Sequence, residues 1–180
     1  AAQDIPVIGE ISGAARAEAG DTLWLNDNLL VIGRGFRTND AGANQIARAV
    51  GQLGIEFQIV DLPCYRGEAA CLHLMSLISL VDTKKALICA ELLPVSLWQR
   101  LKDLDFTLIE APIDEFEQSG TLSTNVLAIS PGRCIMLDGF PKTRAALEQA
   151  GVDLQVFDGD ALCIGCEGGP TCLTRPLLRA

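Results

Sequence analysis

Basic residues are scarce in this 180-residue sequence. It holds 14 Lys and Arg against 23 Asp and Glu, which gives a formal net charge of -9. A negatively charged surface repels phosphate backbones, so this balance argues against nucleic acid as a partner and favours a small cation.

Long hydrophobic runs and targeting signals are also absent. No stretch approaches the roughly 18 apolar residues that a membrane span needs, and the most apolar run, Cys71 to Val81, carries a histidine. The start has neither the basic nor the apolar region of a secretory signal and no initiator Met, so we expect a chain entered partway through a fold. The 7 cysteines, an odd number, need no explanation in a reducing compartment, and we predict a cytoplasmic protein with no membrane partner.

The sequence also lacks the usual cofactor motifs. Gly33-Arg34-Gly35 has no third glycine at the spacing of a phosphate-binding loop, which argues against a bound nucleotide. Cys163-Ile164-Gly165-Cys166 has no second cysteine pair to complete a four-ligand zinc site, and it lies in a late loop rather than at the start of a helix. We therefore predict no metal and no cofactor.

Three similar segments follow one another along the chain. Each is predicted as strand, turn, strand, helix, strand, roughly 50 residues long as repeats go, and the hairpin turns disfavour a doubly wound parallel sheet. The expected elements, in that order, are Thr22–Leu25, Leu29–Gly33, Asn39–Leu53 and Glu56–Leu62; Leu72–Leu80, Ala86–Cys89, Ser96–Lys102 and Phe106–Glu110; and Asn125–Ile129, Cys134–Leu137, Lys142–Ala150 and Leu154–Phe157. The fold class is α/β, built from ββαβ units in a single domain over residues 1–180.

Two residues are candidates for chemistry near neutral pH. His73 is the only histidine and is expected on the apolar strand 72–80, where a buried histidine with one satisfied hydrogen bond is the alternative interpretation. Cys172 follows Gly168-Gly169-Pro170-Thr171, a stiff loop that suits presentation of a thiol; the alternative is a small apolar residue entering a final strand. That apolar interpretation is preferred for four other cysteines, Cys64, Cys71, Cys89 and Cys134. Glu18 and Asp21, in a Gly-containing turn, are by themselves expected to be solvated or to cap local amides.

Taken together, ordered motifs resemble the guanidino-group-modifying superfamily of arginine deiminases, dimethylarginine dimethylaminohydrolases and amidinotransferases. The matching stretches are Glu18-Ala19-Gly20-Asp21, Gly33–Asn39, His73-Leu74-x-Ser76, Thr124-Asn125-Val126-Leu127, Phe140-Pro141-Lys142-Thr143-Arg144 and Gly168-Gly169-x-Thr171-Cys172-Leu173. The resemblance covers almost the whole chain and implies an α/β propeller (pentein fold) of five ββαβ units, of which about three are present.

The resemblance also assigns roles to residues. It implies that Cys172 attacks the guanidinium carbon, that His73 protonates the departing amine and then activates water, and that Glu18 holds the guanidinium nitrogens. A carboxylate that holds this poor electrophile in register, and a covalent intermediate that divides the reaction, make chemical sense. Substrate binding is assigned to Asp21, Arg37, Asn125 and Met75.

Three departures from the family pattern bear on the substrate. The family's upstream guanidinium-binding Asp falls in a segment that this chain lacks. Met75 stands where arginine deiminases have an Asp, and Glu167 stands where they have an Arg that binds the substrate carboxylate. Methylated guanidines are therefore at least as favoured as plain arginine.

The predicted function is hydrolysis of a C–N bond in a guanidine, arginine or N-methylated arginine, once the missing N-terminal part is supplied. An amidinotransferase using the same residues, or a non-catalytic fragment or binding module, are the alternatives. The expected partners are a small cationic guanidino substrate and either a second copy of the chain or the missing N-terminal half.

Overall fold

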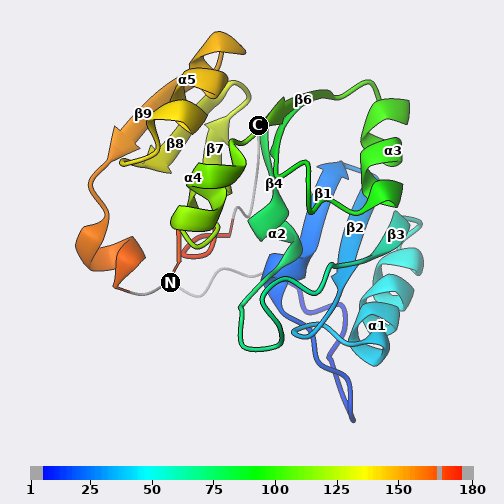
Figure 1. The fold of residues 1–180 in the computed structure, drawn as a ribbon. Coiled ribbons are helices and arrows are strands. Elements are labelled where there is room, and N and C mark those ends of the chain that lie inside the picture. Colours follow the sequence, from blue (N-terminus) through cyan, green and yellow to red (C-terminus); the bar gives the residue numbers. More distant parts are fainter. Residues whose placement is uncertain (1–5, 166–167, 176–180) are drawn as a thin grey trace. The chain divides into compact units, whose positions relative to one another are not determined.

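The computed structural model describes residues 6–165 and 168–175. Within it the chain forms two compact units, residues 1–73 and 74–180, which are considered separately below (Figure 1). Among the described residues, no helix combines the length and the apolarity that a membrane crossing requires.

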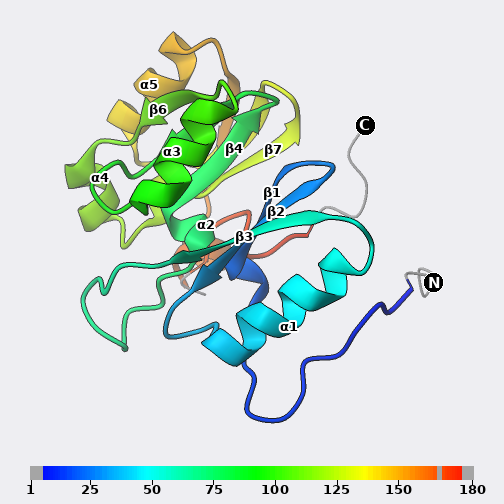
Figure 2. The same ribbon diagram turned by 90° about the vertical axis from the view of Figure 1, so that its right-hand side faces the viewer.

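The first unit contains one repeat. Strands β1 (Thr22–Asn26) and β2 (Leu29–Arg34) pair antiparallel, helix α1 spans Asp40–Gly51, and β3 (Glu56–Asp61) returns parallel to β2. Figure 2 shows α1 running along the sheet that these strands form. Its apolar side chains recur at helical spacing and pack on β2, so one small core holds Leu30, Ile32, Ala43, Ala47 and Val50.

The start of α1 also orders the chain that precedes β1. Asn39 is the N-cap residue, and its side-chain oxygen accepts hydrogen bonds from Gly42 N at 2.9 Å and Arg16 N at 3.0 Å. The backbone N–H of Glu18 donates to Thr38 Oγ1 at 3.1 Å. These contacts fix Glu18 beside the β2–α1 loop.

The second unit contains the other two repeats. Their elements are β4 (Ile78–Asp82), β5 (Lys85–Ile88), α3 (Val95–Asp103) and β6 (Thr107–Glu110), then β7 (Val126–Ser130), β8 (Arg133–Leu137), α5 (Pro141–Gln149) and β9 (Asp153–Phe157). In both repeats the first two strands pair antiparallel and the third pairs parallel with the second. The predicted order of strand, strand, helix, strand is therefore confirmed in all three repeats.

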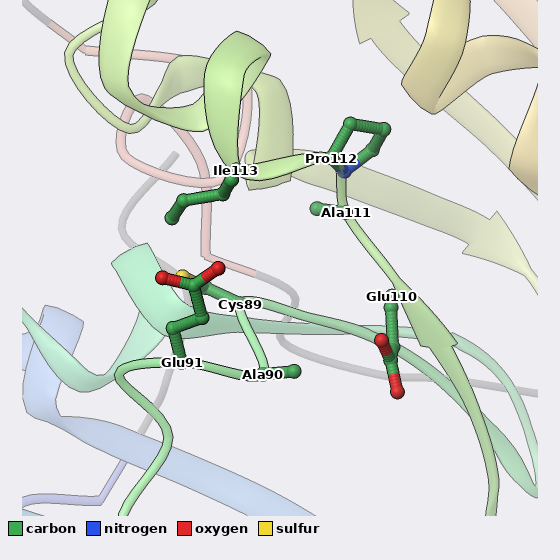
Figure 3. A pocket seen from close by; sticks show the side chains of 7 residues that line it. All are labelled: Cys89, Ala90, Glu91, Glu110, Ala111, Pro112 and Ile113. Carbon is green, nitrogen blue, oxygen red and sulfur yellow. The ribbon is translucent and has the colours of Figure 1, made fainter.

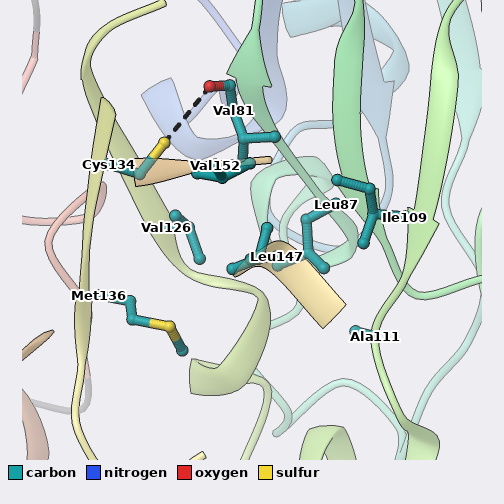
Figure 4. Close-up of a cluster of buried hydrophobic side chains, with 9 residues drawn as sticks. All are labelled: Val81, Leu87, Ile109, Ala111, Val126, Cys134, Met136, Leu147 and Val152. Atoms are coloured by element: carbon teal, nitrogen blue, oxygen red, sulfur yellow. Dashed lines mark hydrogen bonds between the residues drawn. The ribbon is translucent and has the colours of Figure 1, made fainter. Parts of the chain in front are cut away.

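A shared core joins the two repeats of the second unit. Strands β4 and β7 lie side by side, and buried side chains between the sheets include Val81, Leu87, Val126, Met136 and Leu147 (Figure 4). Cys134 belongs to this core, its thiol donates to the Val81 carbonyl at 3.4 Å, and burial raises the pKa of the thiol to about 12. Cys89 is buried too, so the apolar interpretation of these two cysteines is confirmed.

A helix between β6 and β7 was not predicted. Helix α4 (Ile113–Gln118) carries the buried Glu115, whose carboxylate accepts from Lys142 N, Thr143 N and Thr143 Oγ1 at 2.7–2.8 Å. The carboxylate thus satisfies amide groups at the start of α5 that have no partner within the helix. The Phe140–Arg144 motif owes its local structure to this cap.

Two predictions were wrong. The segment 72–80 is not one strand: His73 precedes a short helix, α2 (Leu74–Leu77), and β4 begins only at Ile78. Leu74 and Leu77, three residues apart, are both fully buried, a spacing that one helical turn satisfies and an alternating strand does not. Cys64 and Cys71 are exposed rather than in the core, because both lie in the irregular segment between β3 and α2.

Candidate functional site

Glu18 is the centre of a charged cluster in the first unit. One carboxylate oxygen, Oε1, lies 2.8 Å from Arg37 Nη2, and the other, Oε2, lies 2.7 Å from His73 Nε2. A carboxylate can only accept, so Nε2 carries the proton of this hydrogen bond. The carboxylate therefore holds a guanidinium and an imidazole at the same time.

The electrostatics of this cluster favour the ionised carboxylate. Partial burial acts to raise the pKa of Glu18, but hydrogen bonds and charges from His73 and Arg37 outweigh it, and the pKa lies below its usual value. The pKa of Arg37 is raised, first by its hydrogen bond to Glu18 and then by the nearby Cys71. Both shifts stabilise the charged forms.

Close packing fixes the histidine of this cluster. A Cβ atom at Gly20 would lie 2.8 Å from His73 Cγ, closer than real side chains approach, so Gly20 leaves the space that the ring occupies. Asp21, next in the chain, is fully buried and accepts from Thr38 Oγ1 at 2.6 Å. That contact anchors the turn to the β2–α1 loop, while the substrate-binding role of Asp21 stays a prediction.

Cys71 is a member of this cluster that sequence reasoning placed elsewhere. Its Sγ lies 3.8 Å from His73 Nδ1, whereas the other ring nitrogen, Nε2, faces Glu18. The spacing Cys-x-His was visible in the sequence and would have singled out this thiol. The cluster thus contains a thiol, an imidazole, a carboxylate and a guanidinium.

The second unit presents the other predicted thiol. Asn125, just before β7, is buried, and its Nδ2 donates to Cys172 Sγ at 3.0 Å. Its Oδ1 accepts from both Thr171 N and Thr171 Oγ1 at 2.8 Å. The buried Asn125 side chain therefore holds both Thr171 and the exposed Cys172 thiol in place.

The loop around Cys172 is shaped by close packing. A Cβ atom at Gly169 would lie 2.3 Å from Asn125 Cγ, so only glycine lets the loop lie against that side chain. Cys172 N and Leu173 N both donate to Gly169 O, and residues 168–175 form turns rather than a strand. Within residues 168–175, therefore, Cys172 does not belong to a strand.

Two further predicted positions are in the second unit. Met75 lies on α2, half-buried, with its sulfur 4.0 Å from Arg175 Nη1. Glu167, and Cys166 of the cysteine pair, lie outside the described residues, whereas Cys163 is buried in the helical turn Asp160–Ile164.

A pocket of about 280 Å³ opens where β5 and β6 end (Figure 3). It is lined by Cys89, Ala90, Glu91, Glu110, Ala111, Pro112 and Ile113 and by none of the predicted site residues. Figure 3 shows the two carboxylates turned away from each other, so they do not converge on one ligand.

The structure thus brings the predicted site residues together in two groups. Glu18, Arg37 and His73 contact one another in the first unit, and Asn125 contacts Cys172 in the second. Asp21 is adjacent to the first group through Thr38, and the Met75 sulfur lies near Arg175. Two distinct sets of functional groups result, one charged and one neutral.

The chain is similar in sequence to known arginine deiminases. The arginine deiminase of Mycobacterium marinum is 26% identical over 194 residues, covering 93% of this chain and 48% of that protein. The chain therefore spans about half the length of the curated relatives it matches.

Solved structures share the fold. DDAH from Pseudomonas aeruginosa, a cysteine-to-serine mutant complexed with citrulline, matches with a TM-score of 0.69 and 24% identity over 90% of this chain and 56% of that one. An amidinotransferase from Microseira wollei, in the saxitoxin biosynthetic pathway, matches with a TM-score of 0.75 and 21% identity over 89% of this chain and 47% of that one. The predicted fold class, ββαβ units of the pentein type, is confirmed.

The family is established by sequence as well. The family model described as arginine deiminase matches residues 5–105 and 90–179, which is nearly the whole chain. With the ordered motifs and the repeated ββαβ units, this match identifies the chain as a member of the arginine deiminase family.

Proposed function

We propose that the protein hydrolyses a C–N bond of a guanidine, with Cys172 as nucleophile, His73 as acid and base, and Glu18 holding the guanidinium. The observation that carries the proposal is that Glu18 already binds a guanidinium, that of Arg37, while its second oxygen accepts from His73. A carboxylate that pairs with one planar cation can pair with another of the same shape.

The surroundings of Cys172 support its assignment as nucleophile. The amide of Asn125 donates to the sulfur at 3.0 Å, and a hydrogen bond of this kind is stronger to a thiolate than to a neutral thiol. The thiol is exposed and so can reach a substrate, whereas Cys89 and Cys134 are buried and their pKa values are raised by burial.

The proposed reaction has two steps. The Cys172 thiolate attacks the guanidinium carbon, a C–S bond forms, and the departing amine leaves with a proton from the His73 imidazolium. The neutral imidazole then takes a proton from water, the resulting hydroxide attacks the same carbon, and the C–S bond breaks to release a urea-type product and the thiolate. With arginine the products are citrulline and ammonia; with an N-methylated arginine they are citrulline and a methylamine.

Met75 supports a substituted guanidine as substrate. A thioether cannot accept a strong hydrogen bond from a guanidinium N–H, but it packs well against a methyl group. We infer that N-alkylated guanidines are preferred, with Arg37 and Asp21 contributing to substrate binding in the liganded state.

The activity is proposed for the whole protein, because the chain spans about half of its relatives' length. A further guanidinium-binding carboxylate and the remaining repeats are expected in the part beyond this chain, or in a second copy of it. We propose a cytoplasmic protein with a small guanidino compound as its partner.

Product analysis of the whole protein tests the reaction. Arginine and dimethylarginine are supplied in turn, with and without an acceptor amine, and citrulline, amine and amidino products are quantified. Citrulline that depends on Cys172 supports the hydrolase. An amidino product formed only with the acceptor would identify a transferase instead, and no turnover of any guanidine would leave a binding module.

Alkylation of the chain tests the cation site separately. Chloroacetamidine, a guanidinium mimic with a leaving group, should label Cys172 faster than iodoacetamide does, each rate being taken relative to free cysteine. Glu18→Gln should remove this preference, while Glu10→Gln, an exposed control, should keep it. Equal relative rates in the unmodified chain would contradict the role of Glu18.

A further inference from the structure

The charged cluster of the first unit also has the composition of a metal site. Among the described residues, Glu18, Cys71 and His73 form the one group of three or more potential ligands whose donor atoms all lie within 4.8 Å of one another. The roles proposed for Glu18 and His73 make no use of Cys71. Its thiol, exposed and two residues before the histidine, therefore calls for its own explanation.

The spacing of the thiol and the imidazole suits one bound ion. Zinc lies about 2.3 Å from a thiolate sulfur and about 2.0–2.1 Å from an imidazole nitrogen, so tetrahedral geometry separates the two donors by about 3.5 Å. Cys71 Sγ and His73 Nδ1 lie 3.8 Å apart. An adjustment of a few tenths of an ångström would let both bind the same ion.

The carboxylate prepares the imidazole for this role. Because Glu18 accepts the proton on Nε2, the lone pair of a neutral His73 ring lies on Nδ1, the nitrogen that faces Cys71. Histidines that bind metals usually donate their other N–H to a carboxylate in the same way, which fixes the ring and strengthens the ligand. Gly20, packed against the ring, fixes it further.

We propose that Cys71 Sγ and His73 Nδ1 bind a zinc ion, with Glu18 as the outer carboxylate and water in the remaining positions. A thiolate with an imidazole is a donor pair that suits Zn²⁺ and disfavours Mg²⁺ and Ca²⁺. Two protein ligands make a reversible site, weaker than a four-ligand structural one. The Arg37 guanidinium lies near Cys71, which contributes to raising the pKa of Arg37. Its positive charge repels a bound cation and so weakens the site further.

Zinc at this position has a consequence for catalysis, and this part rests on the proposed function. An ion on Nδ1 removes the basic lone pair of His73, so the ring can no longer take up and return a proton. Zinc would thus act as a reversible inhibitor of guanidine hydrolysis.

Cobalt(II) is the probe for this site, because a thiolate bound to it gives a charge-transfer absorption in the near ultraviolet. The purified chain, kept reduced, is titrated with Co²⁺, and zinc is then added to displace it while a chromophoric chelator reports the affinity. We expect one equivalent of Co²⁺ with the thiolate band, lost on displacement by zinc. A spectrum without that band would overturn the proposal.

Single substitutions locate the thiol. Cys71→Ser should abolish the band, whereas Cys64→Ser, another exposed cysteine of the same unit, and Cys172→Ser should keep it. Loss of the band in Cys172→Ser or in Cys64→Ser, or its persistence in Cys71→Ser, would overturn the assignment. Circular dichroism of each variant checks that the fold is kept, and the result does not depend on whether any guanidine is hydrolysed.

Two variants test the surroundings of the ion. Glu18→Gln should weaken zinc binding about 10- to 100-fold, the usual effect of losing an outer carboxylate. Arg37→Gln should strengthen it, because a neighbouring positive charge is removed. A site that Glu18→Gln leaves unchanged would contradict the role given to this carboxylate.

Discussion

The two groups of functional side chains are held by different forces. In the first unit, Glu18 joins Arg37 and His73 through ion pairs between partly exposed side chains. In the second, Asn125 holds Thr171 and Cys172 through three hydrogen bonds, and the amide itself is buried and uncharged. The first group is charged and accessible to solvent, and the second is neutral and fixed by packing.

This difference suits the two tasks that the proposed chemistry requires. Ion pairs near solvent are worth little individually and exchange partners readily, so Glu18 can release Arg37 and accept a substrate guanidinium. A nucleophile has to be aimed within a fraction of an ångström, and directional hydrogen bonds from a buried side chain achieve this. We therefore expect the first group to respond most to loss of a charge and the second to loss of its hydrogen bonds or close packing.

The largest effect is expected when a charge is added to the second unit. Met75→Asp places a carboxylate on α2, where a free guanidinium N–H can pair with it instead of remaining without a partner. A buried unpaired N–H costs about 1–3 kcal/mol, so the preference for dimethylarginine over arginine should fall roughly 5- to 150-fold. The measurement is kcat/KM for both substrates with the whole protein.

Arg175 provides the control for this experiment. Its guanidinium lies 4.0 Å from the Met75 sulfur, so the carboxylate introduced by Met75→Asp could pair with it rather than with substrate. The double variant Met75→Asp, Arg175→Gln removes that competition and should shift the preference at least as far. A wild type that strongly favours arginine, with no shift in either variant, would mean that position 75 does not face the guanidinium.

The next effect is expected from adding a methyl group beside each of the two groups of functional side chains. Gly169→Ala would place a Cβ atom 2.3 Å from buried Asn125, and Gly20→Ala would place one 2.8 Å from the His73 ring. Overpacking costs about 1–3 kcal/mol where neighbours cannot move. Gly169→Ala should therefore lower the free energy of unfolding more than Gly20→Ala, because its Cβ would come closer to its neighbour and Asn125 is buried, whereas the His73 ring is partly exposed.

Urea unfolding followed by fluorescence measures this difference, because each unit contains one tryptophan, Trp24 in the first and Trp98 in the second. Gly51→Ala is the control, since its Cβ would lie 3.5 Å from the Phe57 ring, an ordinary contact. Equal losses for Gly20→Ala and Gly169→Ala would mean that the two groups are equally rigid.

An effect of similar size is expected from reversing one hydrogen bond. In Asn125→Asp the carboxylate still accepts from Thr171, but it cannot donate to Cys172 and repels the thiolate. A hydrogen bond to a charged group is worth about 1.5–3 kcal/mol, so alkylation of Cys172 by iodoacetamide should slow by about tenfold or more. Asn125→Ala, which loses the contact without adding charge, should slow it less. Unchanged rates in both variants would show that the amide does not act on the sulfur.

The smallest effect concerns pH. The pKa of Glu18 in the folded protein lies below its usual value of 4.5, so its ion pairs stabilise the fold above that pH and the contribution is lost as the pH falls through the lowered pKa. The difference in free energy of unfolding between the wild type and Glu18→Gln should thus shrink as the pH is lowered from above 4.5 to below the lowered pKa. The difference for Asn125→Ala should stay constant over the same range, because neutral groups hold that residue. A constant difference for Glu18→Gln would mean that its ion pairs add nothing to stability.

Much of the architecture could be read from local signals. The order of strands and helices in the three repeats follows from alternation, helical spacing and Gly-containing turns, all of which act over a few residues. Helix α4 was missed because Pro112 precedes only six helical residues, too few to show a period. The segment at His73 was assigned to a strand because an unbroken apolar run has no period that distinguishes helix from strand.

The candidate site was predictable only in part. The motifs located Glu18, Arg37, His73, Asn125 and Cys172, and the structure shows which of them contact one another within each unit. The joint action of the two groups, and the assignments of Asp21 and Met75 to substrate binding, stay predictions. Cys71 was missed because its sequence context is apolar, although it lies in an irregular segment that leaves the thiol exposed.

The sequence by itself determined the family, the repeats and the residue types available for chemistry, because these depend on order and spacing along the chain. Only the tertiary structure decided that Arg37 pairs with Glu18, that Asn125 holds Cys172 and that Cys71 lies beside His73. Contacts between Glu18 and His73, or between Asn125 and Cys172, span dozens of residues. They follow from how loops pack against one another, and no local periodicity encodes that packing.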